Sequence, residues 1–333
     1  MDKPLNVRLM EMSRGVQALR DAYKAVPGET PFVQDQPQQK SGTDQLGPYA
    51  QAIEELQHLT GIVLSDRHRE KLLDLMRHES ATEWLRRMRS GLTQAHLQDL
   101  IEAITVHETY FYRDASQFEH LRTEILPAII QREMNKPSPT IRIWSAACSS
   151  GEEAYTLAMM TLDALLEVGQ AQESISGDIR VNPRWKLELL GTDISQKIVD
   201  FAKNGRYSMI GLNAFRGMPQ KLLRFFGNTT APLSQAHHFE ENHLEIKDFL
   251  RRLVSFKSHN LLDSILPIEQ CDIILCRNVL IYFNIETRRR VQSLLHKALS
   301  TGGTLMLGPP DTLLLQEEFE SRWKADSVCY IKK

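Results

Sequence analysis

Two adjacent glutamates form the strongest chemical signal in this sequence. They are Glu152 and Glu153 in the run SAACSSGEEAYTLA, residues 145–158, between an apolar segment and a helical pattern. Small residues let a ligand approach the backbone, and the first N–H groups of a helix are free to bind it. Gly151 is the one glycine of the run, so it is neither a dinucleotide fingerprint nor a phosphate loop. Two carboxylates there suit a cationic ligand, or they merely complement the helix dipole.

A second acidic signal follows one helix later. Asp193 ends the apolar segment WKLELLGTDI. In open α/β sheets, an acidic residue at the carboxyl end of a strand holds ribose hydroxyls. Asp193 is alternatively the cap of a helix that begins near Gln196. S-adenosylmethionine combines a ribose with a sulfonium and an ammonium group, so it matches both acidic signals.

Two further runs carry polar and aromatic side chains. In CRNVLIYF, residues 276–283, a strand ends in Arg-Asn, which places Asn278 at the same sheet edge with Tyr282 beyond it. They are alternatively a turn residue and a core aromatic. In TVHETYFYRDASQF, residues 105–118, three aromatics precede Arg113. The aromatics can cover a nucleoside and the arginine can bind a carboxylate, or the run packs between two domains.

The elements that must position these residues alternate from about Thr140 onward. Apolar strand segments alternate with helical patterns, which predicts a mostly parallel, doubly wound sheet with helices on both faces. Residues 205–252 interrupt the alternation with a small antiparallel β insertion. A helix in ETRRRVQSLLHKALS is expected to stop at Gly302-Gly303, and WKADSVCYIKK closes the chain as one or two strands.

The chain before this sheet is helical by pattern. Residues 1–25 form an amphipathic helix, with its apolar residues on one stripe, and residues 26–48 read as a flexible linker rich in Pro, Gly and Gln. Residues 49–126 form a helical domain, in which Gly61 ends one helix and Ser65 caps the next. The sheet domain then occupies residues 127–333.

Composition limits the function further. The net charge of −2 gives no reason to expect nucleic acid as a partner, and no apolar run is long enough to span a membrane. The N-terminus lacks the features of a signal peptide, so we expect a cytoplasmic protein without direct membrane insertion. The four cysteines form no C-x-x-C pair and are expected to be buried free thiols.

Taken together, the ordered motifs resemble the CheR-type chemotaxis receptor methyltransferase family. The matching runs are TxxxTxFxR, WSAAxSxGEExYxxA, DI and CRNVxIYF, and the resemblance extends from about Tyr49 to Lys333. It implies a class I S-adenosylmethionine-dependent methyltransferase fold, Rossmann-like, with an N-terminal all-helical domain. It also implies the residues that bind the donor: His107, Thr109, Arg113, Glu152 at the methionyl end, Asp193 at the ribose, Asn260 and Leu261 beside the adenine, and Asn278 and Val279 under the cofactor.

The implied activity is methyl-ester formation on glutamates of the cytoplasmic domain of a chemoreceptor-like protein. S-adenosyl-L-homocysteine is the product. No general base is needed because a carboxylate is already a nucleophile, and no metal is needed because the sulfonium is a good leaving group. Arg113 is expected to orient the substrate glutamate, with Tyr282 assisting. Two alternatives stay open: a methyltransferase for a non-receptor substrate, and a catalytically weak S-adenosylmethionine-binding scaffold. A dehydrogenase is excluded by the missing glycines.

Two departures and two surfaces complete the expectations. His107 stands where the family commonly has asparagine, and GPPDT, residues 308–312, replaces a Gly-His-Ser-Glu run, which puts a role for that loop in doubt.

The N-terminal helix can have a further partner. The helical domain carries a basic stretch that either docks a glutamate-rich receptor or pairs with its own carboxylates. These basic residues are Arg67, His68, Arg69, Lys71, Arg77, Arg86, Arg87 and Arg89.

Overall fold

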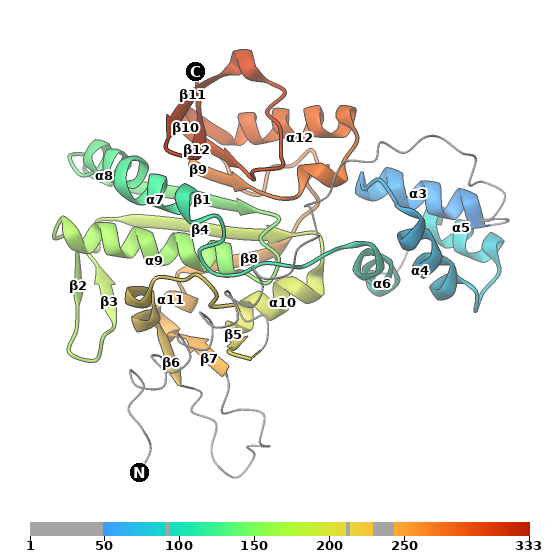
Figure 1. Cartoon of the computed structure of the whole chain (residues 1–333), viewed down its shortest axis with the longest axis horizontal. Helices are drawn as coiled ribbons and strands as arrows, with labels where there is room; N and C mark the ends of the chain where they lie inside the picture. Colours follow the sequence, from blue (N-terminus) through green and yellow to red (C-terminus); the bar gives the residue numbers. More distant parts are fainter. Residues whose placement is uncertain (1–48, 91–93, 211–213, 229–242) are drawn as a thin grey trace, which may run out of the picture. The chain divides into compact units, whose positions relative to one another are not determined.

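A computed structural model describes residues 49–90, 94–210, 214–228 and 243–333 (Figure 1). The expected helix at 1–25 and linker at 26–48 lie outside these residues, as do two parts of the expected insertion.

Helices make up the first described segment. They are α3 (Ala50–Thr60), α4 (Asp66–Met76), α5 (Ala81–Ser90) and α6 (Gln94–Ile104). Gly61 ends α3 in the left-handed conformation, with φ of 72°. The Ser65 hydroxyl accepts a hydrogen bond from His68 N at the start of α4, so both predicted helix boundaries are confirmed.

A seven-stranded sheet follows, and its strand order is β11-β12-β10-β9-β1-β4-β8. Its strands are β1 (Thr140–Ala146), β4 (Lys186–Asp193), β8 (Val254–Ser258), β9 (Cys271–Cys276), β10 (Leu299–Leu307), β11 (Phe319–Lys324) and β12 (Ser327–Lys332). Strands β10, β9, β1, β4 and β8 pair in parallel, whereas β12 is antiparallel to both its neighbours. The predicted doubly wound sheet is therefore confirmed, and the closing segment forms a hairpin.

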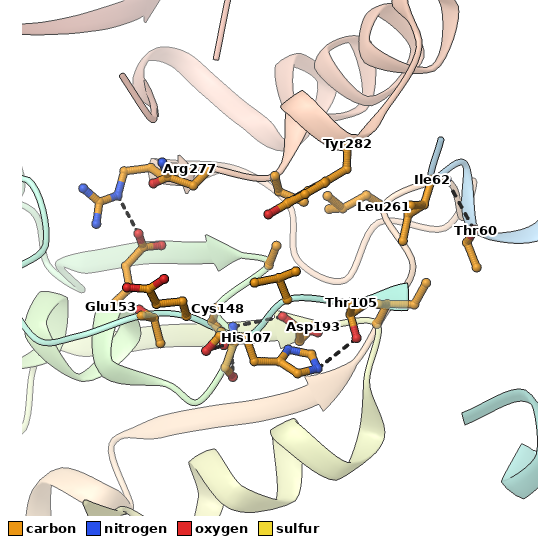
Figure 2. Close-up of a pocket in the computed structure, with 18 of the residues that line it drawn as sticks. Thr60, Ile62, Thr105, His107, Cys148, Glu153, Asp193, Leu261, Arg277 and Tyr282 are labelled. Carbon is orange, nitrogen blue, oxygen red and sulfur yellow. Dashed lines mark hydrogen bonds and ion pairs between the residues drawn. The ribbon is translucent and has the colours of Figure 1, made fainter. Parts of the chain in front are cut away.

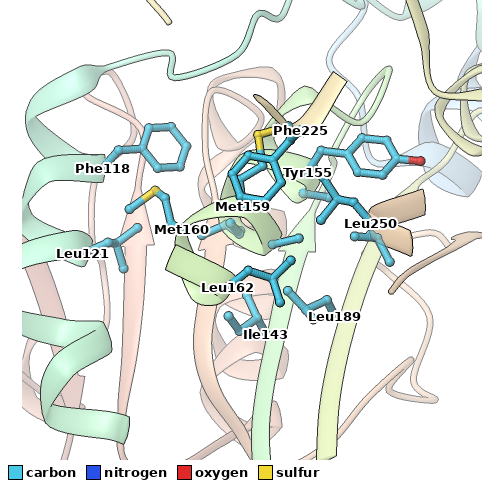
Figure 3. Packing of buried hydrophobic residues seen from close by; sticks show 14 of the residues in the cluster. Phe118, Leu121, Ile143, Tyr155, Met159, Met160, Leu162, Leu189, Phe225 and Leu250 are labelled. Carbon is cyan, nitrogen blue, oxygen red and sulfur yellow. The ribbon is translucent and has the colours of Figure 1, made fainter. Parts of the chain in front are cut away.

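Helices cover both faces of this sheet (Figure 1). One face packs against α7 (Ala115–His120), a π-helical turn (Leu121–Ile125), α8 (Leu126–Glu133), α9 (Glu152–Glu167) and α10 (Gln196–Asn204). Figure 3 shows Met159 and Leu162 of α9 among side chains of the strands and of α7. The other face shares a core with α12 (Ile285–Ala298) and with α3, α4 and α6. All six residues of β9 are buried, as expected for a central parallel strand.

The insertion after α10 is a small antiparallel sheet, as predicted. Its strands β5 (Arg206–Ser208), β6 (Phe226–Asn228) and β7 (His243–Ile246) have the order β5-β7-β6. A 3₁₀ helix (Gln220–Phe225) and the short α11 (Asp248–Arg251) accompany them. The four cysteines are free and buried, which confirms that expectation.

Three features differ from the sequence-based expectations or were not predicted. A hairpin of β2 (Ala171–Glu173) and β3 (Ile179–Val181) follows α9. Gly302-Gly303 does not stop a helix, because α12 leads directly into β10 and the two glycines lie at a register shift of that strand. The expected domain boundary at 126 falls inside the continuous helical run 115–133, whose buried side chains pack on the sheet. We propose that the boundary lies before that run.

Gly151 sets the turn between β1 and α9, and we predict that its replacement destabilises the fold. Its φ is 95°, and a Cβ there would lie 2.8 Å from the Ala202 Cβ. We expect Gly151→Ala to lower the free energy of unfolding by about 2 to 4 kcal/mol in urea titrations. Gly169→Ala is the matched control: its φ is 68° but no heavy atom lies within 4 Å of the added Cβ, so only about 1 kcal/mol is expected. Equal losses would contradict this account.

Candidate functional site

A pocket lies at the carboxyl ends of β1, β4, β8 and β9. The space between its walls is about 960 Å³ when the open solvent at its entrance is included. Its walls come from the turns after those strands, the segment 104–109 and residues near the end of α3. Figure 2 shows Arg277 and Tyr282 on one side of the pocket and His107, Glu153 and Asp193 on the other. The predicted residues that line it are His107, Thr109, Arg113, Asp193, Asn260, Leu261, Asn278, Val279 and Tyr282.

The Asp193 carboxylate joins the ends of two strands. Its Oδ2 accepts a hydrogen bond from Ser149 N at 2.9 Å, and its Oδ1 accepts one from Ser195 N at 3.1 Å. Burial raises the pKa of Asp193, while the Ser195 hydrogen bond and the charge of His107 oppose the rise. A carboxylate fixed in this way keeps lone pairs for further hydroxyl donors.

The turn after β1 has an unusual backbone. Ala147 and Ser149 have φ of 63° and 49°, although neither is glycine. Cys148 N donates to Thr192 O at 2.8 Å, which ties this turn to β4. Left-handed residues other than glycine are uncommon and concentrate at functional sites. Both Ala147 and Ser149 line the pocket, together with Cys148.

Of the two adjacent glutamates, Glu153 lines the pocket. Ser145 Oγ donates to its Oε1 at 2.7 Å and Arg277 Nε donates to its Oε2 at 2.6 Å, so its two oxygens are engaged. Glu152, the residue predicted from the motif, is outside the pocket lining and is 4% exposed. Ser150 Oγ donates to its carboxylate at 2.6 Å, and burial raises its pKa to about 7.

Arg277 is a buried arginine that binds several segments of the chain, and the sequence analysis did not identify it. Besides Glu153, its guanidinium donates to Arg113 O at 2.8 Å and to Gln117 Oε1 at 2.9 Å. It also lies over the Phe118 ring. Arg277 therefore connects β9, α9 and the segment that carries Arg113. The one sequence feature that could have indicated this role is its position directly before Asn278 in the CRN run.

The turn after β9 is held by Asp311, from the loop whose role was in doubt. The Asp311 carboxylate accepts hydrogen bonds from Asn278 N at 2.6 Å, Ile281 N at 3.2 Å and Gly308 N at 3.2 Å. Asn278 has a φ of 59°. The GPPDT loop thus fixes the backbone that presents Asn278 and Tyr282.

Arg113 and Tyr282 both line the pocket. Arg113 Nη1 donates to Glu108 O at 2.8 Å. Burial raises the pKa of the Tyr282 hydroxyl, and the positive charge of Arg113 acts in the opposite direction. The side chain of Asn260 reaches Leu59 O at 2.8 Å, so the loop after β8 is attached to α3.

The three aromatics before Arg113 do not cover the pocket, which corrects the suggestion that they stack on a nucleoside. None of them is among the pocket-lining residues. Phe111 packs against Tyr207 of the insertion at 4.8 Å between ring centroids, and the Tyr112 hydroxyl bonds Glu119 at 2.5 Å. Hydrophobic burial places Phe111 and Tyr112 in the sheet core instead, whereas the Tyr110 ring lies under the Arg216 guanidinium.

Residues 107–328 match the family model described as CheR methyltransferase, SAM binding domain. The chain belongs to the CheR methyltransferase family. It is 31% identical over 273 residues to chemotaxis protein methyltransferase 1 of Vibrio cholerae serotype O1, covering 80% of this chain and 89% of that one. It is 31% identical over 243 residues to the chemotaxis protein methyltransferase of Borreliella burgdorferi, covering 73% and 77%. It is 32% identical over 247 residues to chemotaxis protein methyltransferase 1 of Pseudomonas aeruginosa, covering 73% and 79%.

Membership in the CheR family gives the fold and the donor. The sheet, its helices and the pocket form a class I methyltransferase domain that binds S-adenosylmethionine. Within the described ranges, no group of three or more His, Cys, Asp or Glu side chains is arranged to hold a metal ion. In those same ranges no helix has the length and apolar character of a membrane span.

The buried Glu152 predicts a pH dependence of stability for this CheR protein. Its folded pKa of about 7 is above its ordinary value of 4.5, so the folded state binds the proton more tightly. Stability is therefore lost as pH rises between these values. We expect Glu152→Gln to gain about 3 kcal/mol relative to the original chain between pH ~5 and ~8 in urea titrations of the free protein.

The control for this titration is Glu167→Gln, at the exposed end of the same helix. It should leave the pH profile of stability unchanged. If the free energy of unfolding of Glu152→Gln varied with pH in parallel with that of the original chain, the raised pKa of Glu152 would be refuted.

Proposed function

We propose that this methyltransferase forms methyl esters on glutamate side chains in the cytoplasmic domain of a chemoreceptor-like protein. One observation carries the proposal: Arg113 and Tyr282 line the same pocket as Asp193 and Asn278. A group that pairs with a carboxylate thus lies in the cavity that has the features of the donor site. The names of the similar proteins support chemotaxis as the setting.

The residues of the pocket fit S-adenosylmethionine. The buried carboxylate of Asp193, fixed at a strand end, suits the ribose hydroxyls. Leu261 and Ile104 add apolar surface for the adenine, with Asn260 beside it. Thr109, His107 and Val279 complete the proposed set. Bound S-adenosylmethionine supplies a methyl group on a positively charged sulfonium.

The methionyl end has two acidic candidates in the first turn of α9. Glu153 is neutralised by Arg277, and its carboxylate is engaged on both oxygens. Among the described residues, no Arg or Lys side chain lies at hydrogen-bond distance from the Glu152 carboxylate. Its burial therefore disfavours the charged form and raises its pKa. A cationic ligand nearby would lower that pKa. We therefore retain Glu152 as the proposed partner of the ammonium group.

Arg113 has the role of orienting the substrate carboxylate. Its backbone carbonyl is held by Arg277, while its guanidinium donates to Glu108 O and has further N–H groups for a substrate. A charge-assisted hydrogen bond aligns one carboxylate oxygen and leaves the other free to attack. Tyr282 lies in the same pocket and can donate its hydroxyl hydrogen to the same carboxylate.

The helical region is the proposed docking surface for the receptor. Two of its exposed arginines pair locally: Arg77 with Asp74 at 3.0 Å, and Arg86 with Glu83 at 2.6 Å. Exposed ion pairs contribute little stability, so a glutamate-rich partner can replace the local carboxylates. A cytoplasmic location follows from this proposed substrate. A partner for the N-terminal helix stays a prediction.

The direct test is transfer of a labelled methyl group from S-adenosylmethionine to receptor cytoplasmic fragments. We expect label that mild alkali releases as methanol, because esters hydrolyse under conditions in which N-methyl groups persist. Label stable to alkali would refute the glutamate ester, and absence of transfer to any receptor fragment would refute the substrate.

In the same assay, Arg113→Ala is expected to reduce transfer by roughly a hundredfold or more, because an aligning interaction at the reacting carboxylate is lost. Its thermal midpoint should stay close to that of the original chain. Its dissociation constant for the donor should stay within a few-fold of the original value. Arg122→Ala is the matched control, since Arg122 pairs with Glu119 and lies outside the pocket. Full transfer by Arg113→Ala would eliminate its role.

A further inference from the structure

Helix α6 contacts the turn that follows β4. Gln98 Nε2 donates to Ile194 O at 3.3 Å, and Gln196 N donates to Gln98 Oε1 at 2.7 Å. One turn along the helix, Glu102 Oε1 accepts a hydrogen bond from Ser195 Oγ. Residues four apart lie on the same face of a helix, so Gln98 and Glu102 act on consecutive residues of the turn.

The same turn fixes Asp193. Ser195 N donates to Asp193 Oδ1, and Ser195 Oγ accepts a hydrogen bond from Ile198 N as the cap of α10. The Ser195 hydroxyl therefore has its donor and acceptor roles filled by Glu102 and Ile198. Its orientation, and with it the backbone N–H that binds Asp193, is set from both sides.

Glu102 also reaches the pocket by a second route. Its Oε2 lies 3.6 Å from His107 Nε2, and Thr105 Oγ1 lies 2.9 Å from the same nitrogen. Ser149 Oγ donates to His107 O at 3.1 Å. One carboxylate of α6 thus contacts both the turn that carries Asp193 and the segment that carries His107.

We propose that Gln98 and Glu102 are positioning residues that set the affinity for the methyl donor by holding the Asp193 turn. Neither residue lines the pocket. The helical region, beyond the substrate docking proposed for it above, thereby becomes part of the donor site. This inference rests on the proposed role of Asp193.

A coupling between the two parts of the protein follows from this arrangement. Whatever strengthens the contact of α6 with the turn strengthens donor binding, and donor binding stabilises the contact by the same factor. A substrate that docks on the helical region can therefore change the affinity for the donor. It needs no contact with the donor itself.

The test is calorimetric binding of S-adenosyl-L-homocysteine to the full chain. Gln98→Ala and Glu102→Ala should each raise the Kd roughly tenfold, the effect of losing one charge-assisted or paired hydrogen bond. Alanine is the best helix former, so α6 should persist, with thermal midpoints close to the original. Glu102→Gln keeps an oxygen acceptor for Ser195 and should bind within about twofold of the original.

Asp99→Ala is the control on the exposed face of α6 and should leave the Kd unchanged. Because Glu102 acts in part through Ser195, the losses caused by Glu102→Ala and Ser195→Ala should be less than additive in a double-mutant cycle. Unchanged affinity in both alanine variants, or an equal loss in Asp99→Ala, would overturn the proposal. If the original chain itself fails to bind, the proposed function fails instead.

Discussion

The site depends on a single constraint: β1 and β4 run in parallel and end side by side. Their ladder extends from Thr140↔Lys186 to Ala146↔Thr192, so the turn after β1 must meet Asp193. The Ser149 N–H completes this junction by donating to the Asp193 carboxylate. The proposed donor site depends on that hydrogen bond, because it fixes a buried acid beside the turn after β1. This geometry requires a left-handed backbone at Ala147, Ser149 and Gly151, and the strain at the two residues that are not glycine is unfavourable for folding.

Around this junction, buried polar groups fix the segments that carry the side chains proposed to contact substrate and donor. Arg277 holds the backbone of Arg113, and Asp311 holds that of Asn278. Each of these buried charges is satisfied: Arg277 by Glu153, and Asp311 by backbone N–H groups. A buried charge without such partners would be unstable, so the networks persist only as complete units. The same logic extends to α6, whose carboxylate at Glu102 supports the neighbouring turn.

Local patterns in the sequence predicted most of the fold. Helix caps such as Ser65 and the alternation of strands with helices depend on neighbouring residues, and the structure confirms them. Asp193 and Asn278 were predicted because parallel strands share a carboxyl edge, whereas most of the other site residues came from the family resemblance. All of the predicted residues except Glu152 line one pocket. The supporting groups were not predicted. Arg277 and Glu153 are 124 positions apart, so their contact depends on strand order and on the rotation of α9. Gly302-Gly303 lie inside β10 at a shift in its register with β9, and this register is not encoded in any local sequence pattern.

Hydrogen exchange of the free protein and of its complex with S-adenosyl-L-homocysteine tests the central claim most directly. The claim predicts increased protection in the turn after β1, the turn after β4, the loop after β8 and the CRN turn, all at one edge of the sheet. The hairpin of β2 and β3 should exchange as before. Protection confined to that hairpin, with none at the turns that meet Asp193, would contradict it.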